Sequence, residues 1–103
     1  MMIAEEVGLP AVLEQTAEEA AELAHACLKL ARFLRRENPT PVSEDEARRA
    51  VTEEYADVEV CASVLREAGV VDMADVCETV VRKRARWKSR LKQSREGTEA
   101  WEE

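Results

Sequence analysis

The sequence predicts an all-α protein, an antiparallel helical bundle of three long helices with a short N-terminal segment, completed by homo-oligomerisation. Gly and Pro number three each among 103 residues, about half of their usual combined share of roughly 12%. So few turn-forming residues exclude a domain of many short strands. Hydrophobic residues make up 46% of the chain, enough for a packed core. We expect one domain over residues 1–95 and an acidic tail that frays over residues 96–103.

The first long helix is expected from Pro10 to about Glu37. Pro10 suits the first turn of a helix, where a backbone N–H has no partner to lose. No helix-breaking residue occurs after it until residues 38–41, which read N-P-T-P. These prolines end the helix, because a residue that precedes a proline is pushed out of the α region.

The second helix is expected from Ser43 to about Ala68. Ser43 and Glu46 have the spacing of a capping box, in which the serine hydroxyl accepts from the backbone three residues on. Gly69 comes directly after the last helical residue, where the left-handed conformation that glycine tolerates commonly ends a helix.

The third long helix is expected from Asp72 to about Arg95. Asp72 has the side chain of an N-terminal cap, and Gly97 marks the expected end. Because the connections between the three helices are short, successive helices are expected to pack antiparallel.

The charge is uneven along the chain. There are 22 acidic and 15 basic residues, a formal net charge of −7, which disfavours nucleic-acid and membrane partners. Eight of the basic residues lie between Arg82 and Arg95, where no acidic residue occurs. The remainder of the chain is therefore strongly acidic.

The chain is expected to be cytoplasmic. No stretch approaches the roughly 18 apolar residues of a membrane-spanning helix, and the first residues are acidic, unlike the basic start of a signal peptide. Cys27, Cys61 and Cys77 are odd in number and far apart in sequence. We expect all three to be reduced and buried as small hydrophobic residues.

Two helices each direct a pair of carboxylates toward the core. At about 100° per residue, Glu19 falls inside the apolar arc of the first helix and Glu22 lies at its edge. Glu54 lies in the middle of the apolar stripe of the second helix, with Asp57 one turn further on. Burying carboxylates without partners costs several kcal/mol each. A Mg²⁺ or Mn²⁺ ion would offset that cost, and Arg84, within the apolar stripe of the third helix, is the rival partner.

These carboxylates also match a family pattern. Residues 18–22 read E-E-x-x-E and residues 54–57 read E-x-x-D, and a basic segment, K-R-A-R at residues 83–86, lies on the third helix. Over residues 15–91 the chain resembles the all-α nucleoside triphosphate pyrophosphohydrolases, the MazG-like group. The resemblance implies Mg²⁺-dependent hydrolysis of a nucleoside triphosphate to the monophosphate and pyrophosphate. It also implies a homodimer or homotetramer.

The resemblance assigns roles to individual residues. It implies that four catalytic carboxylates bind Mg²⁺, or Mn²⁺ in its place: Glu19, Glu22, Glu54 and Asp57. Glu18 would reach a second ion or orient a water molecule. Lys83 and Arg86 would bind the substrate through its phosphate oxygens. Carboxylate-bound Mg²⁺ neutralises the triphosphate and stabilises the leaving pyrophosphate.

Two other interpretations stay open. Residues 22–25 read E-x-x-H, half of the motif of ferritin-like di-iron bundles, and a homodimer would supply two copies; otherwise His25 is a surface histidine. The apolar stripes, the small size and the acidic tail also fit a non-catalytic helical oligomerisation or adaptor module. Trp87 is expected in the core, although it could instead stack on a nucleobase.

Overall fold

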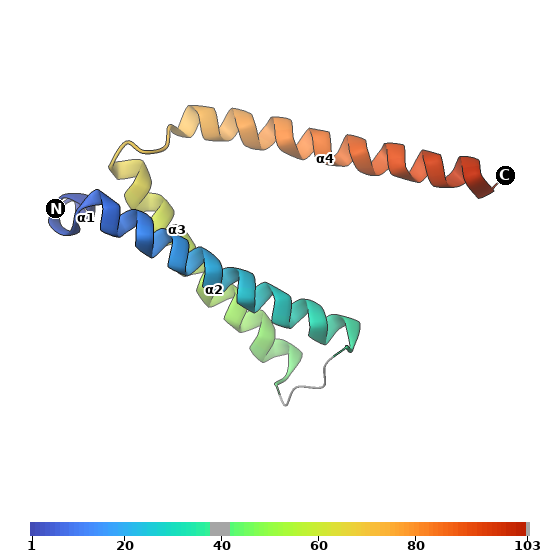
Figure 1. The fold of residues 1–103 in the computed structure, drawn as a ribbon, viewed down its shortest axis with the longest axis horizontal. Helices are drawn as coiled ribbons and strands as arrows, with labels where there is room; N and C mark the ends of the chain where they lie inside the picture. The colour runs from blue at the N-terminus through green and yellow to red at the C-terminus, as the bar shows by residue number, and fades with distance from the viewer. Residues whose placement is uncertain (38–41, 103) are drawn as a thin grey trace. The chain divides into compact units, whose positions relative to one another are not determined.

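Four helices make up the described part of the chain, which is residues 1–37 and 42–102 of the computed structural model, with side chains described through residue 97 (Figure 1). They are α1 (Ile3–Val7), α2 (Leu9–Arg35), α3 (Glu44–Glu67) and α4 (Met73–Glu102). No strand occurs within these residues, so the all-α prediction is confirmed. The chain divides into two compact units, one of Met1–Val70 and one that begins at Val71.

The first unit opens with α1, a single short turn of helix within the expected N-terminal segment. Gly8 separates it from α2 with φ of 90°, a conformation that favours glycine. Pro10 lies in the first turn of α2, as predicted, and α2 ends at Arg36 in the left-handed conformation, φ 58°. The turn predicted at 38–41 lies outside the described residues.

The limits of α3 are set by its capping residues. The Ser43 hydroxyl accepts a hydrogen bond from the Glu46 backbone N–H at 3.1 Å, so the predicted N-terminal cap is confirmed. At the other end, Gly69 has φ of 75°, and the N–H of Val70 reaches back to the carbonyl of Leu65 at 3.0 Å. This is the left-handed helix end that the glycine predicts.

α2 and α3 lie side by side and antiparallel, and α1 packs against both (Figure 1). The antiparallel prediction is therefore confirmed for the first two long helices. Among residues 1–37 and 42–97, five small or medium-sized hydrophobic residues are buried: Val12, Ala26, Ala47, Cys61 and Val64. The place of the third long helix in the bundle, and homo-oligomerisation, stay predictions.

The second unit is the helix α4 and the residues that lead into it. The Asp72 side chain accepts from the Asp75 backbone N–H at 3.1 Å, so the predicted cap is confirmed. The end predicted at Arg95 is wrong, because α4 continues through Gly97 to Glu102. Gly97 does not take a positive φ, and a glycine in a right-handed helix costs only about 1 kcal/mol. Gly97 therefore lies within the helix, whereas Gly69, which has a positive φ, follows the end of one.

The three cysteines do not share one environment. Cys61 is buried, but Cys27 and Cys77 are exposed, so the expectation that all three are buried is wrong. Cys27 comes directly after the buried Ala26 and is rotated by about 100° from it around the helix. No helix of the described residues has both the length and the apolar character needed to cross a membrane.

Candidate metal centre

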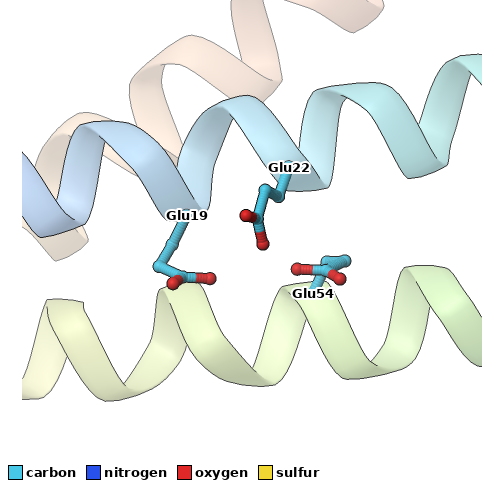
Figure 2. Close-up of side chains that lie close together, drawn as sticks. All are labelled: Glu19, Glu22 and Glu54. Carbon is cyan, nitrogen blue, oxygen red and sulfur yellow. The ribbon is translucent and has the colours of Figure 1, made fainter.

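Three carboxylates from two helices meet in the first unit. Glu19 and Glu22 project from neighbouring turns of α2, and Glu54 projects toward them from α3 (Figure 2). One carboxylate oxygen of each lies within 4.8 Å of the other two. We call these three residues the acidic trio. Of the four carboxylates expected to face the core, Glu19 and Glu54 are half-buried in the interface, whereas Glu22 and Asp57 are exposed.

Two of the trio, Glu19 and Glu54, occupy a layer of the helix interface that is otherwise apolar. Glu19 lies seven residues after the buried Val12 and seven before the buried Ala26 on α2. Glu54 is placed in the same way on α3, between the buried Ala47 and Cys61. Seven residues are close to two helical turns, so each glutamate shares a face with its buried neighbours. If the interface served stability alone, apolar side chains would be expected at both positions, 19 and 54.

The carboxylates lack enough hydrogen-bond donors. One oxygen of Glu19 accepts from the Gln15 side-chain amide at 2.7 Å. The second oxygen of Glu19 and one oxygen of Glu54 are buried and have no hydrogen-bond partner. Within residues 1–37 and 42–97, one pair of oppositely charged side chains lies within 4 Å, that of Arg48 and Glu44. None of the trio takes part in it. Uncompensated negative charge therefore remains at the centre of the interface.

The electrostatics act most strongly on Glu54. Its pKa is raised above the ordinary value of 4.5, first by burial and then by a hydrogen bond to the Glu22 carboxyl. The negative charges of Glu22, Asp57 and Glu19 raise the pKa further, because each disfavours a second ionised carboxylate nearby. The ionised form of Glu54 is thus held in an unfavourable environment.

The trio fits a hard divalent cation. Carboxylate oxygens are the ligands that Mg²⁺ and Mn²⁺ prefer. Ligand oxygens lie about 2.1 Å from Mg²⁺, and so up to about 4.2 Å from one another, which is close to the observed spacing of the trio. A cation held by the trio would offset the charge of Glu19 and Glu54, each of which has a buried oxygen without a partner in the part of the chain that the structure describes. It would also reduce the repulsion among the three carboxylates.

The other predicted site residues lie outside the trio. Glu18 and Asp57 are exposed; Asp57 is one turn from Glu54 and acts on it through its charge. Lys83, Arg86 and the rival partner Arg84 lie on α4, in the second unit. Their predicted roles toward the carboxylates stay predictions.

A recess of about 420 Å³ adjoins the acidic trio. Of two further polar residues in its lining, Lys29 was not predicted as a site residue, and His25 was considered only as part of a di-iron motif or as a surface histidine. Glu22 and Glu54 form part of its wall, together with His25 and Lys29 of α2. The helical wheel places both residues on the polar side of α2. Their spacing from Glu22, three and seven residues, was the available signal, because such residues share a helix face.

Comparison with protein-family models, with curated proteins and with solved structures gave no match for the chain. The chemistry of the site is therefore inferred from its own residues. The acidic trio provides oxygen ligands, and the recess beside it provides space for a ligand that combines a metal ion with further polar groups.

Proposed function

We propose that the protein is a Mg²⁺-dependent nucleoside triphosphate pyrophosphohydrolase of the MazG-like type. The observation that carries this proposal is the acidic trio, in which Glu19 and Glu54 take apolar positions between α2 and α3 and the exposed Glu22 lies beside them. Structural carboxylates are expected to face solvent or to pair with Lys or Arg, whereas Glu19 and Glu54 are half-buried and have no such pair among the described residues. The E-E-x-x-E and E-x-x-D patterns on these two helices support the same activity.

The proposal gives each residue a role. Glu19, Glu22 and Glu54 would hold the Mg²⁺, or Mn²⁺, and Asp57 would join them by turning its side chain inward. When bound, the ion would neutralise phosphate charge and lower the pKa of a coordinated water. Glu18, exposed beside Glu19, would orient a water molecule. Lys83 and Arg86 would contact phosphate oxygens.

The reaction is the addition of one water molecule across a phosphoanhydride bond. The bond between the α- and β-phosphoryl groups breaks, and the water oxygen forms a new bond to phosphorus. The products are a nucleoside monophosphate and pyrophosphate, and the water protons pass to phosphate oxygens or to the solvent. A homodimer or homotetramer is part of the proposal.

The test is turnover of nucleotides by the Glu54→Gln variant. With Mg²⁺ and a panel of canonical and common modified nucleoside triphosphates, the wild type should release pyrophosphate and the monophosphate. Glu54→Gln should lower kcat/KM about 100-fold or more, because an amide is a poor ligand for a hard cation. The matched control is Glu59→Gln, which removes an exposed carboxylate of α3 and should leave turnover unchanged. Equal, negligible turnover by wild type and Glu54→Gln on every nucleotide would refute the proposal.

The alternative function is a non-catalytic helical oligomerisation or adaptor module. The observation that favours it is an open apolar groove of about 870 Å³ along α4, lined in part by Val80, Trp87 and Leu91. Such a face is typical of a surface that binds another helix. This function requires partner binding that survives the combined replacement of Glu19, Glu22, Glu54 and Asp57 by Gln or Asn. It also requires that Mg²⁺ leave the Tm unchanged.

A further inference from the structure

We infer that the recess beside the acidic trio binds the phosphate groups of the substrate, with Lys29 and His25 as the residues that contact them. The inference rests on the proposed function, because it concerns the part of a metal-bound polyphosphate that extends beyond the ion. It adds two α2 residues that no sequence motif of the family assigns here. Both residues belong to the same unit as the trio.

The first argument for phosphate binding is the position of three polar residues on α2. Glu22, His25 and Lys29 line one recess, and their spacing places them on a single helix face that spans about 10 Å. The rest of the lining that joins them is largely alanine, from Ala21 and Ala26 on α2 and Ala50 on α3. These short side chains leave the space of the recess open. Its volume of about 420 Å³ lies within the range of small-molecule sites, about 300–1,000 Å³.

The second argument is the positive charge and the hydrogen-bond donors in the recess. Among the described residues that line the recess, Lys29 supplies the positive charge, and no described carboxylate lies within 4 Å of its ammonium. Its three N–H donors are therefore available to an anion. The His25 ring, exposed on the same face, adds a further N–H donor. A polyphosphate that starts at the trio and runs along α2 would meet first His25 and then Lys29.

The chemistry of the lining distinguishes phosphate from nucleobase. Nucleobases are commonly held by stacking on Phe, Tyr or Trp. None of these residues is among the described residues that line the recess. The recess combines carboxylates at one end with N–H donors along α2, which matches a metal ion joined to a row of phosphate oxygens.

The experiment compares the binding of Mn²⁺ alone with the binding of Mn²⁺–tripolyphosphate, an inorganic probe that has no base or sugar. Lys29→Gln should weaken tripolyphosphate binding about tenfold, because it removes a charge-assisted hydrogen bond. The same variant should bind Mn²⁺ as tightly as the wild type or more tightly, since a positive charge near the trio is gone. Lys29→Arg should restore tripolyphosphate binding, and His25→Gln should weaken it by a smaller factor. The control is Arg35→Gln, which removes an exposed cation of α2 outside the recess and on another face of the helix.

The outcomes separate the inference from the proposed function. Weaker tripolyphosphate binding by Lys29→Gln, with Mn²⁺ binding unchanged or tighter and with Arg35→Gln neutral, would support the inference. If Lys29→Gln and Arg35→Gln weaken tripolyphosphate binding equally, the effect is general attraction and the inference fails, while the metal centre stands. If the wild type binds no Mn²⁺, the proposed function fails and the inference with it. Circular dichroism of every variant verifies that the helices are intact.

Discussion

Glu54 bears most of the electrostatic cost of the acidic trio. It lies between two buried layers of α3, has one buried oxygen without a partner, and faces the carboxylates of Glu19 and Glu22. A helical wheel identifies Glu19 and Glu54 because both interrupt an apolar face. It also directs Asp57 toward the core, and this is wrong, because Asp57, rotated from Glu54 by about 300°, is exposed. The angle on a wheel shows the direction of a side chain, but a flexible carboxylate near the edge of an interface can turn either way.

The raised pKa of Glu54 predicts a pH dependence of stability in metal-free protein. A carboxyl group whose pKa is higher in the folded state binds more protons folded than unfolded, so its contribution destabilises the fold as pH rises. This destabilisation of the folded state is absent at pH values below the ordinary pKa of 4.5 and reaches its full size at pH values above the raised pKa. Glu54→Gln should therefore increase the free energy of unfolding at pH 8, and the increase should shrink toward pH 4.5. Urea denaturation in the presence of a chelator measures both.

The control for this prediction is again Glu59→Gln, an exposed carboxylate of the same helix. It should give the same small change in the free energy of unfolding at both pH values. If the Glu54→Gln variant were less stable than the wild type at pH 8, ionised Glu54 would not be destabilising the fold, and the prediction would be wrong.

At the scale of helices, the sequence predicts most boundaries because side chains at the ends make specific hydrogen bonds. Ser43 and Asp72 begin α3 and α4 by accepting from the backbone N–H three residues on. Gly69 ends α3 with a positive φ, but Gly97 lies within α4. The two glycines differ in backbone conformation because the residues after them differ. Thr98 and its successors can continue a helix, whereas Val70 and Val71 lead into the next cap.

The two glycines therefore predict opposite effects of the same substitution. Gly97→Ala should stabilise the end of α4 by about 0.5–1 kcal/mol, because alanine loses less conformational entropy in a helix. A Cβ at this position would meet no atom within 4 Å. Gly69→Ala should destabilise the first unit by about 1 kcal/mol, because φ of 75° is strained for alanine.

Amide hydrogen exchange measures the first of these effects and urea denaturation the second. In Gly97→Ala, the amides near Gly97 should exchange more slowly. Unchanged exchange there would mean that the helix ends before this residue in solution.

At the scale of the whole molecule, each of the two units, taken by itself, exposes large apolar side chains. Five hydrophobic residues among those whose side chains are described are buried, whereas Leu28 of α2 is 56% exposed and Leu91 of α4 is 53% exposed. Trp87, expected in the core, is 69% exposed. The apolar arcs were predictable from the sequence, because the helical period fixes them. Which neighbour covers each arc was not predictable, since an arc matches any other apolar surface of similar shape.

This surface predicts association of the chain with itself. Light scattering should give a mass of two or four chains at micromolar concentration. Leu91→Gln should shift the equilibrium toward monomers by about 2 kcal/mol or less, because a buried leucine contributes that much to association. The control is Lys92→Gln, the adjacent exposed residue, which should leave the mass unchanged. A single-chain mass at every concentration would contradict the prediction.

Because the three cysteines lie in different environments, the rates at which their thiols react can report on the separation of the helices. Cys27 and Cys77 are exposed, whereas Cys61 is 8% exposed and lines a pocket of about 310 Å³ where α1, α2 and α3 meet. A thiol reagent should therefore modify Cys61 more slowly than the other two cysteines, and its rate should rise when these helices separate. The acidic layer lies two turns from Cys61 on the same helix. Labelling of this thiol therefore monitors, without any added fluorophore, how firmly the helix pair that carries the carboxylates is held together.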